Sequence, residues 1–250
     1  MELFEQERLQ RLNDSEFSVY NYISGHLQEA EQMNIRELAA ATGVSTTTIL
    51  RFCGKLGCDG YKDFKYRLHR AAEKRQNWQM FFPSVIHAIQ FLQWADNSQT
   101  ISQQLGTVSD WCQQSRQVLF AGVGSSGHLA SYGARLLSGL GITAFAVTDP
   151  FYPLPLREME DTLLIALSVS GETPTIISMA DGFKKKHAKA VSITNTKECT
   201  LAKMSDIHFF YYMPISYAHP TAETATLTTQ IPVMYLLESL MCRIHEAQKG

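Results

Sequence analysis

Three hydroxyl-bearing side chains gather in one short segment, Ser168-Val-Ser-Gly-Glu-Thr-Pro174. The segment follows an unbroken apolar run over residues 163–167, which is typical of a strand buried on both faces of a parallel sheet. Pro174 is tolerated at the first position of a helix, where its missing N–H would have no partner. The pattern therefore predicts a turn from a strand into a helix. Backbone N–H groups, the helix dipole and the hydroxyls would together suit a phosphate group.

A second segment has the same order of features. A mostly apolar stretch over residues 117–121 leads into Gly122-Val-Gly-Ser-Ser-Gly127 and then into a predicted helix over residues 127–138. Glycines let a backbone approach a ligand closely, and serines can donate hydrogen bonds to it. A dinucleotide-binding turn is also rich in glycine, but the acidic residue expected about twenty positions later would be Asp149, which ends no suitable strand. Plain helix capping is the alternative for the turn that ends at Pro174.

The two turns together resemble those of the sugar isomerase (SIS) domain, an α/β module that binds phosphosugars. The resemblance covers roughly residues 100 to 245. It implies that Ser126, Ser168, Ser170 and Thr173 hold the phosphate of a sugar. With their neighbours in the turns and one later acid, the predicted phosphosugar-binding residues are Gly124, Ser125, Ser126, Ser168, Ser170, Gly171, Thr173 and Glu223.

The surrounding chain alternates predicted strands with predicted helices. Strands are expected at residues 117–121, 142–147, 162–167, 189–194 and 207–212, and helices at 127–138, 174–186, 199–204 and about 222–246. Such alternation predicts a parallel sheet with helices on both faces, in which ligands bind at the carboxyl ends of the strands. Both serine-containing turns fall at those ends.

The N-terminal third has the pattern of a helix-turn-helix motif. A short predicted helix over residues 35–41 is followed by a tight turn at Gly43, and Ser45 is a good N-cap for a second helix that ends near Lys55. Apolar residues on one side of this second helix would face a core. Its other side would face the major groove of double-stranded DNA, and the predicted DNA-binding residues are Ser45, Thr46, Thr47, Thr48, Arg51 and Lys55.

Charge supports the DNA hypothesis, although an ordinary pair of helices is the alternative. The whole chain has a formal net charge of −2, yet residues 46–75 contain eight basic and three acidic residues, a net charge of +5. A basic segment in an acidic protein is the electrostatic pattern expected of nucleic-acid binding.

Residues 12–68 also resemble the N-terminal domain of the RpiR family of bacterial transcription regulators. The resemblance is carried by Ile35-Arg-Glu-Leu-Ala39, Gly43-Val-Ser45, Thr48-Ile-Leu-Arg-Phe52 and Lys55-Leu-Gly57. The family joins this domain to an SIS domain, in the order found here. The resemblance thus implies an all-α helix-turn-helix domain over residues 1–75 and an α/β SIS domain with a parallel sheet flanked by helices over 98–250. Residues 76–97 between them are rich in apolar side chains and few in charges, which predicts a helical linker that packs against its own chain or another subunit.

The overall composition argues against a disordered, membrane-spanning, secreted or metal-binding protein. A 250-residue chain with 45% hydrophobic residues can form one large core or two domains and is not mainly disordered. No apolar run is long enough to span a bilayer, and an acidic start is unlike a signal peptide, so we expect a cytoplasmic protein with no membrane partner. Five scattered cysteines lack the spacing of a metal site and are expected to be reduced thiols, and no cofactor is expected.

The main hypothesis is a non-enzymatic regulator that binds an operator and responds to a sugar phosphate. A homodimer or homotetramer is expected, because operator half-sites usually match a two-fold axis of the protein. A phosphosugar isomerase with a helical extension is the alternative, in which Glu223 and His219 would provide acid–base catalysis. In a third hypothesis the SIS domain is only a dimerisation scaffold.

Overall fold

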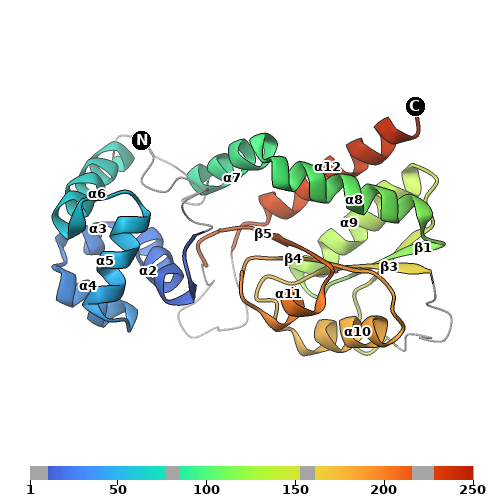
Figure 1. Ribbon diagram of the computed structural model, residues 1–250, viewed down its shortest axis with the longest axis horizontal. Helices are drawn as coiled ribbons and strands as arrows, with labels where there is room; N and C mark the ends of the chain where they lie inside the picture. The colour runs from blue at the N-terminus through green and yellow to red at the C-terminus, as the bar shows by residue number, and fades with distance from the viewer. Residues whose placement is uncertain (1–10, 77–84, 153–160, 216–227, 250) are drawn as a thin grey trace. The chain divides into compact units, whose positions relative to one another are not determined.

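The computed structural model of the protein describes residues 11–76, 85–152, 161–215 and 228–249 (Figure 1). These residues fall into two compact units. One unit comprises the described residues within Met1–Trp94 and Tyr212–Thr229, and the other comprises those within Ala95–Tyr211 and Gln230–Gly250. The first contains helices and no strand among its described residues, whereas the second contains a parallel sheet. The predicted fold class is confirmed.

Residues 11–76, the part of the first unit described up to that point, contain five helices. They are α2 (Asp14–Gly25), α3 (Leu27–Gln32), α4 (Ile35–Thr42), α5 (Thr46–Lys55) and α6 (Gly60–Gln76). A further helix, α7 (Val85–Asn97), follows residues that lie outside the described ranges. The helix-turn-helix expectation corresponds to α4 and α5. The short helix α3 was not predicted, because its six residues are too few for a clear apolar periodicity.

Local capping explains where these helices begin. Asn13 and Glu16 form a capping box at the start of α2, and Asn34 and Glu37 form another at the start of α4. The Ser45 hydroxyl accepts a hydrogen bond from the backbone N–H of Thr48 and so caps α5, as predicted. Each cap satisfies N–H groups that have no partner inside the helix.

Apolar side chains from α2, α4, α5 and α6 share one small core. The fully buried members include Tyr20, Ile23, Leu38, Ile49, Phe52 and Phe64. Phe52 and Phe64 lie edge to face with ring centroids 5.7 Å apart, which joins α5 to α6. This core holds one face of α5 inward and leaves the opposite face on the surface.

The second unit contains a five-stranded sheet whose hydrogen-bonded pairs are all parallel. Its strands are β1 (Gln117–Ala121), β2 (Ala144–Val147), β3 (Thr162–Leu167), β4 (Ala190–Thr194) and β5 (Ile207–Phe210), and their order across the sheet is β2-β1-β3-β4-β5. Every residue of β3 and β4 is buried, which agrees with their unbroken apolar patterns. All five strands lie within two residues of the predicted ranges.

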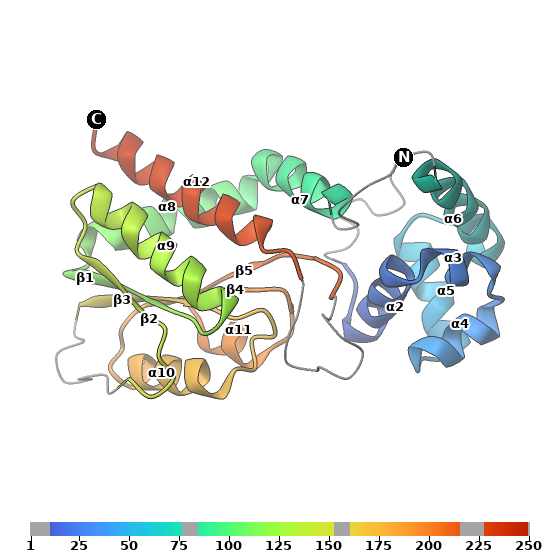
Figure 2. The same cartoon turned by 180° about the vertical axis from the view of Figure 1, so that it is seen from behind.

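Helices cover both faces of this sheet. The face that carries α9 (Ser125–Gly139) is also covered by α8 (Gln99–Gln114) and α12 (Ile231–Ala247), whereas α10 (Pro174–Lys185) and α11 (Thr200–Met204) cover the other face (Figures 1 and 2). Parallel strands need such crossovers, and the helices bury the apolar side chains that project from each face.

The predicted C-terminal helix is shorter than expected. The prediction of a continuous helix from about residue 222 is wrong, because residues 228–230 have no helical structure and α12 begins at Ile231. Pro232 consequently lies in the first turn of α12, where proline is tolerated, and does not kink its middle. Residues 216–227 lie outside the described ranges.

The remaining expectations concern cysteines and membranes. Cys53, Cys58, Cys112 and Cys199 are buried, Cys242 is exposed, and none of the five forms a disulfide with another described residue. Among the helices of the described ranges, none is long and apolar enough to cross a bilayer. Within the same ranges, no cluster of His, Cys, Asp or Glu is arranged as metal ligands would be.

Candidate functional site

Strand pairing brings the two serine-containing turns together. β1 and β3 are hydrogen-bonded neighbours, and Ala121 at the end of β1 pairs with Ala166 near the end of β3. The turns that follow these strands therefore leave the sheet side by side at its carboxyl edge. The order β2-β1-β3-β4-β5 changes direction between β1 and β3, and α9 and α10 lie on opposite faces. Ligands of open α/β sheets bind at such a switch point.

The first turn is shaped by close backbone contacts. A Cβ atom on Gly122 would lie 2.6 Å from the carbonyl oxygen of Ser126, so no other residue fits there without a backbone shift. Ser125 and Ser126 occupy the first two positions of α9, where backbone N–H groups have no partner within the helix. Ser126 is buried and Ser125 is exposed. The turn thus offers main-chain donors and hydroxyls at the positive end of a helix.

The second turn is shaped by hydrogen bonds between the residues of the turn itself. The Ser168 hydroxyl accepts the backbone N–H of Gly171 at 3.1 Å and lies 2.9 Å from the Thr173 hydroxyl. The exposed Ser170 hydroxyl accepts the N–H of Glu172 at 3.1 Å. Thr173 is the N-cap of α10 and makes no side-chain capping bond. Because the Ser168 and Ser170 oxygens accept these N–H groups, their hydroxyl protons remain available to rotate toward an anion.

Position 171 requires a glycine, both for its backbone conformation and because neighbouring atoms leave no room for a side chain. Its φ of +69° belongs to the left-handed region, and a Cβ atom there would lie 2.2 Å from Sγ of Cys199. The N–H of Leu201 also donates to the Gly171 carbonyl, which ties this turn to α11. The second turn is therefore held from behind by residues that follow β4.

Glu172 is the acidic side chain of the second turn. Its carboxylate accepts the backbone N–H of Thr200 at 2.7 Å, and this hydrogen bond lowers the pKa of the carboxyl group below its usual value. The side chain is thereby directed to the start of α11. A carboxylate stabilised in its charged form is a weak base, so Glu172 is poorly suited to abstract a proton from a sugar carbon.

These arrangements suit anion binding. Two helices, α9 and α10, begin at neighbouring turns, and their dipoles favour negative charge at the same edge. The predicted residues Gly124, Ser125 and Ser126 come from one turn, and Ser168, Ser170, Gly171 and Thr173 come from the other. Glu223 and His219, which complete the predicted set and its catalytic alternative, lie outside the described residues.

A cavity of about 430 Å³ lies elsewhere on the sheet unit. Its lining includes Trp111 from the end of α8, Thr162 from the start of β3 and Lys189 just before β4. Those positions belong to the amino edge of the sheet, opposite the serine-containing turns. No residue of either turn lines it.

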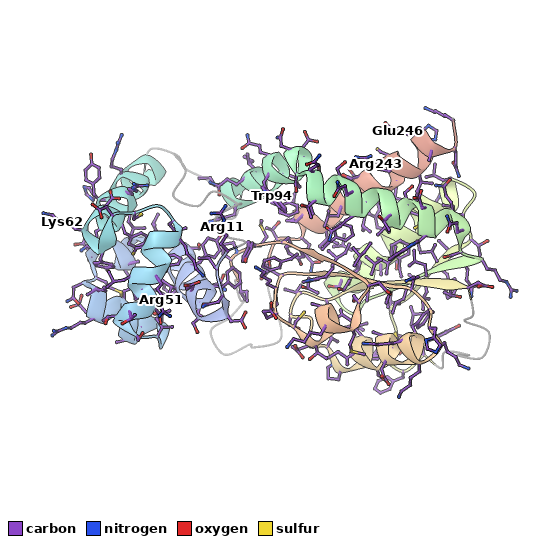
Figure 3. The ribbon with its side chains drawn as sticks, in the orientation of Figure 1. Arg11, Arg51, Lys62, Trp94, Arg243 and Glu246 are labelled. Carbon is purple, nitrogen blue, oxygen red and sulfur yellow. The ribbon has the colours of Figure 1, made fainter. Side chains whose placement is uncertain are left out.

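The second candidate site is the outer face of α5, on the surface of the helical unit. Thr46, Thr47 and Arg51 are exposed there, and Figure 3 labels Arg51 on α5. Ser45 and Thr48 are joined through their hydroxyls, 3.0 Å apart, in the cap of the helix. Three of the predicted DNA-binding residues thus present side chains to the surface, while two organise the start of the helix that carries them.

Lys55 has a role that its position in the sequence did not indicate. Its ammonium lies 2.5 Å from the carboxylate of Glu16, which is only 1% exposed, and also donates to the carbonyl of Arg11. A buried carboxylate needs such a partner. Lys55 therefore neutralises Glu16 and joins α5 to α2, and this contact across 39 residues had no signal in local periodicity.

Two family profiles match the chain in the order of its two units. The profile described as "Helix-turn-helix domain, rpiR family" matches residues 2–75, and the profile described as "SIS domain" matches residues 113–238, half of the chain. The protein belongs to the RpiR family. The resemblance to this family, predicted from the serine-containing turns and the helix-turn-helix motif, is confirmed.

Similar sequences span both parts of this RpiR-family protein. It is 26% identical over 245 residues to an HTH-type transcriptional regulator of Clostridium perfringens, covering 92% of this chain and 86% of the relative. It is 29% identical over 205 residues to the HTH-type transcriptional regulator GlvR of Bacillus subtilis, covering 78% and 76% of the two chains. These relatives are named as transcriptional regulators.

A solved structure shares the fold. The NanR protein of Vibrio vulnificus, solved in complex with ManNAc-6P, is 24% identical to this RpiR-family protein with a TM-score of 0.59. The match covers 96% of this chain and 89% of NanR. It extends the common fold beyond the sheet to the helical N-terminal region.

Some residues of the two sites were missed by sequence reasoning. Cys199 packs against the second serine-containing turn, and Leu50 and Gly54 lie on the exposed side of α5. For Leu50 and Gly54 a signal existed, since both fall outside the buried stripe formed by Ile49, Phe52 and Cys53. For Cys199 there was none, because its contact with Gly171 depends on the pairing of β3 with β4.

Proposed function

We propose that this protein is a transcriptional regulator whose operator binding responds to a sugar phosphate held at the carboxyl edge of its sheet. The observation that carries this proposal is the pairing of β1 with β3, which places two hydroxyl-rich helix starts side by side at a switch point. The first unit supplies a helix-turn-helix motif, and relatives that span most of the chain are named as transcriptional regulators.

In this proposal the outer face of α5 enters the major groove of double-stranded DNA. Thr46, Thr47 and Arg51 contact base edges or adjacent phosphates. Lys62 and Arg70 are exposed on α6, and they supply affinity that falls as salt is added. Ser45 and Thr48 act by holding the helix start, and Lys55 acts through its ion pair with Glu16.

The proposed ligand is a phosphorylated sugar. Its phosphate lies between Ser125 and Ser126 of the first turn and Ser168, Ser170 and Thr173 of the second, against the starts of α9 and α10. Gly124 and Gly171 give the backbone its path around the ligand, and Glu223 contacts the sugar. NanR was solved with ManNAc-6P, so an N-acylated hexosamine phosphate is a suitable first compound to test.

We further propose that the protein binds its ligand without converting it and acts in the cytoplasm as a homodimer or homotetramer. The carboxylate next to the turns, Glu172, is stabilised in its charged form by Thr200 and is a weak base. The competing hypothesis of an isomerase rests on Glu223 and His219, and it predicts turnover that Glu223→Gln abolishes.

The sugar phosphate is proposed to change operator affinity by favouring one arrangement of the DNA-binding units over another. A ligand shifts such an equilibrium only by its differential affinity for the two states, and typical couplings of ~1–3 kcal/mol alter affinity about five- to a hundred-fold. Linkage is reciprocal, so operator DNA must change the affinity for the sugar phosphate by the same factor.

Thermal unfolding with a panel of sugar phosphates tests the ligand. Hexose, hexosamine and pentose phosphates are compared with their unphosphorylated sugars, and a compound at a hundred times its Kd should stabilise the unit that binds it by ~2.7 kcal/mol. The stabilisation should disappear in Ser170→Ala and in the Ser168→Ala/Ser170→Ala double variant. It should persist in Ser138→Ala, whose hydroxyl contacts Ala144 at the amino edge of the sheet.

Operator binding is measured next, on duplex DNA selected by the protein from a randomised library. The stabilising sugar phosphate should change the Kd for this DNA at least fivefold. If none of the phosphorylated sugars stabilises the protein, the hypothesis that the sheet unit is only a dimerisation scaffold remains. If the protein converts the stabilising compound into an isomer, the isomerase hypothesis is established. Failure to select any sequence would remove the regulator hypothesis altogether.

A further inference from the structure

One apolar side chain stands among the polar ones on the outer face of α5. Leu50 is 48% exposed, whereas the buried residues of α5 are Ile49, Phe52 and Cys53. At about 100° per residue, the exposed residues of α5 cover a continuous arc of about 140°, and Leu50 lies inside it. The residues of this arc are Thr46, Thr47, Leu50, Arg51 and Gly54.

Gly54 gives independent evidence that something approaches this face. It is the second-last residue of α5, and within a helix glycine is less favourable than alanine by about a factor of two to five in helix formation. Nothing within the described molecule requires it, because a Cβ atom at Gly54 would have no neighbour within 4 Å and its φ is not positive. A missing side chain next to Leu50, one turn along the same face, suits the close approach of another molecule.

This arc contains side chains that donate hydrogen bonds, the apolar side chain of Leu50, and Gly54, which has no side chain. Thr47 and Arg51 can hydrogen-bond to base edges or phosphates, but a hydrogen bond to Leu50 is impossible. In the major groove, the apolar group that a base edge presents is the C5 methyl of thymine. An exposed leucine between hydrogen-bonding residues on a recognition helix therefore has one matching chemical partner on DNA.

We propose that Leu50 recognises the C5 methyl group of a thymine in the operator and makes the protein specific for thymine at that position. The inference rests on the proposed DNA-binding function and adds a residue that distinguishes one base from another. The contact removes the methyl group and the leucine side chain from water, and a pairing of this kind is worth about fourfold in affinity for each buried methyl-sized group.

Replacement of thymine by deoxyuridine tests this contact, because deoxyuridine lacks only the C5 methyl. Each thymine of the selected operator is replaced singly, and the Kd for the full-length protein is measured by fluorescence anisotropy at fixed salt. For the wild-type protein, deoxyuridine at one position in each half-site should weaken binding about fourfold. For Leu50→Ala the same replacement should have no effect, although its affinity for the original operator is lower.

Two further variants separate Leu50 from its neighbours. Leu50→Asn keeps a side chain of similar length but makes it polar, and it should also lose the difference between thymine and deoxyuridine. Thr47→Ser removes one methyl group from the adjacent exposed position, and it should keep that difference. Unfolding curves for all three variants should match the wild type, because the positions are exposed.

Several results would overturn the proposal. Equal binding of thymine- and deoxyuridine-containing operators by the wild-type protein would exclude methyl recognition while leaving operator binding intact. A difference that persists in Leu50→Ala but vanishes in Thr47→Ser would assign the methyl contact to Thr47. If the wild-type protein selects no DNA sequence, the proposed function fails and this inference fails with it.

Discussion

The carboxyl edge of the sheet and the outer face of α5 are constructed in opposite ways. At the sheet edge the main chain forms the site, and Gly171 is so tightly packed against Cys199 that it has no room for a side chain. On α5 exposed side chains form the site, and Gly54 is surrounded by open space. Substitutions at Gly171 should therefore change folding and ligand binding together, whereas substitutions of the exposed side chains of α5 should change binding alone.

The largest effect is expected for Gly171→Ala. A φ of +69° is unfavourable for alanine, and its Cβ would overlap Sγ of Cys199, so the free energy of unfolding should fall by about 2–5 kcal/mol. Urea unfolding measures this change. Gly106→Ala in α8 is the matched control, because it has space and should be neutral or slightly stabilising. Similar curves for the two variants would mean that the edge is not packed as described.

The pH dependence of stability should report on the burial of His208, which lies beside Thr194 at the end of β4. His208 on β5 lies 2.8 Å from the Thr194 hydroxyl, and burial lowers the pKa of its imidazole from 6.5 to about 4. Between these values the unfolded chain binds more protons than the folded one, so stability should be lost as pH falls from about 6.5 to about 4. Allowing for partial exposure, His208 should account for ~1–3 kcal/mol of this loss.

Variant comparison isolates that contribution. Urea unfolding of the wild type and of His208→Gln, repeated at several pH values, should show a smaller loss for the variant in the same window. Parallel pH profiles would contradict a buried neutral imidazole. The affinity of the α5 face for DNA is not expected to follow this titration.

Lys55→Ala and Arg51→Ala should separate a structural cation from a binding one on the same helix. Lys55→Ala leaves the buried Glu16 carboxylate without its partner and should lower the free energy of unfolding by ~1–3 kcal/mol. Arg51→Ala should change stability by less than ~0.5 kcal/mol and weaken specific operator binding by ~1–3 kcal/mol. An unchanged operator affinity for Arg51→Ala would exclude α5 as the recognition helix.

A small change in stability, opposite in sign to those of Gly171→Ala and Lys55→Ala, is expected for Gly54→Ala. Alanine fits the helical backbone without a contact closer than 4 Å, so the free energy of unfolding should rise by ~0.5–1 kcal/mol. Operator affinity should nevertheless fall, because the added methyl lies on the face of α5 that is proposed to contact DNA. A variant that is more stable and binds DNA as well as the wild type would show that this face makes no close contact.

Local patterns predicted much of this fold. The apolar run before Ser168 identified a buried strand, and Ser45 identified the start of α5, because strands and caps depend on residues a few positions apart. The same reasoning extended the last helix upstream of Ile231, since propensity alone does not show where a helix loses its packing partners. It also gave no sign of the ion pair between Lys55 and Glu16, because Glu16 is distant in sequence.

The sequence by itself determined the type of each element, the composition of both turns and the order of the two parts, because these depend on short-range periodicity and on residue types with specific backbone preferences. Only the tertiary structure decided that β1 pairs with β3, that Cys199 closes against Gly171 and that Lys55 neutralises Glu16. Such contacts join segments far apart in the chain. They arise when many buried surfaces pack at once, and no short window of sequence contains that information.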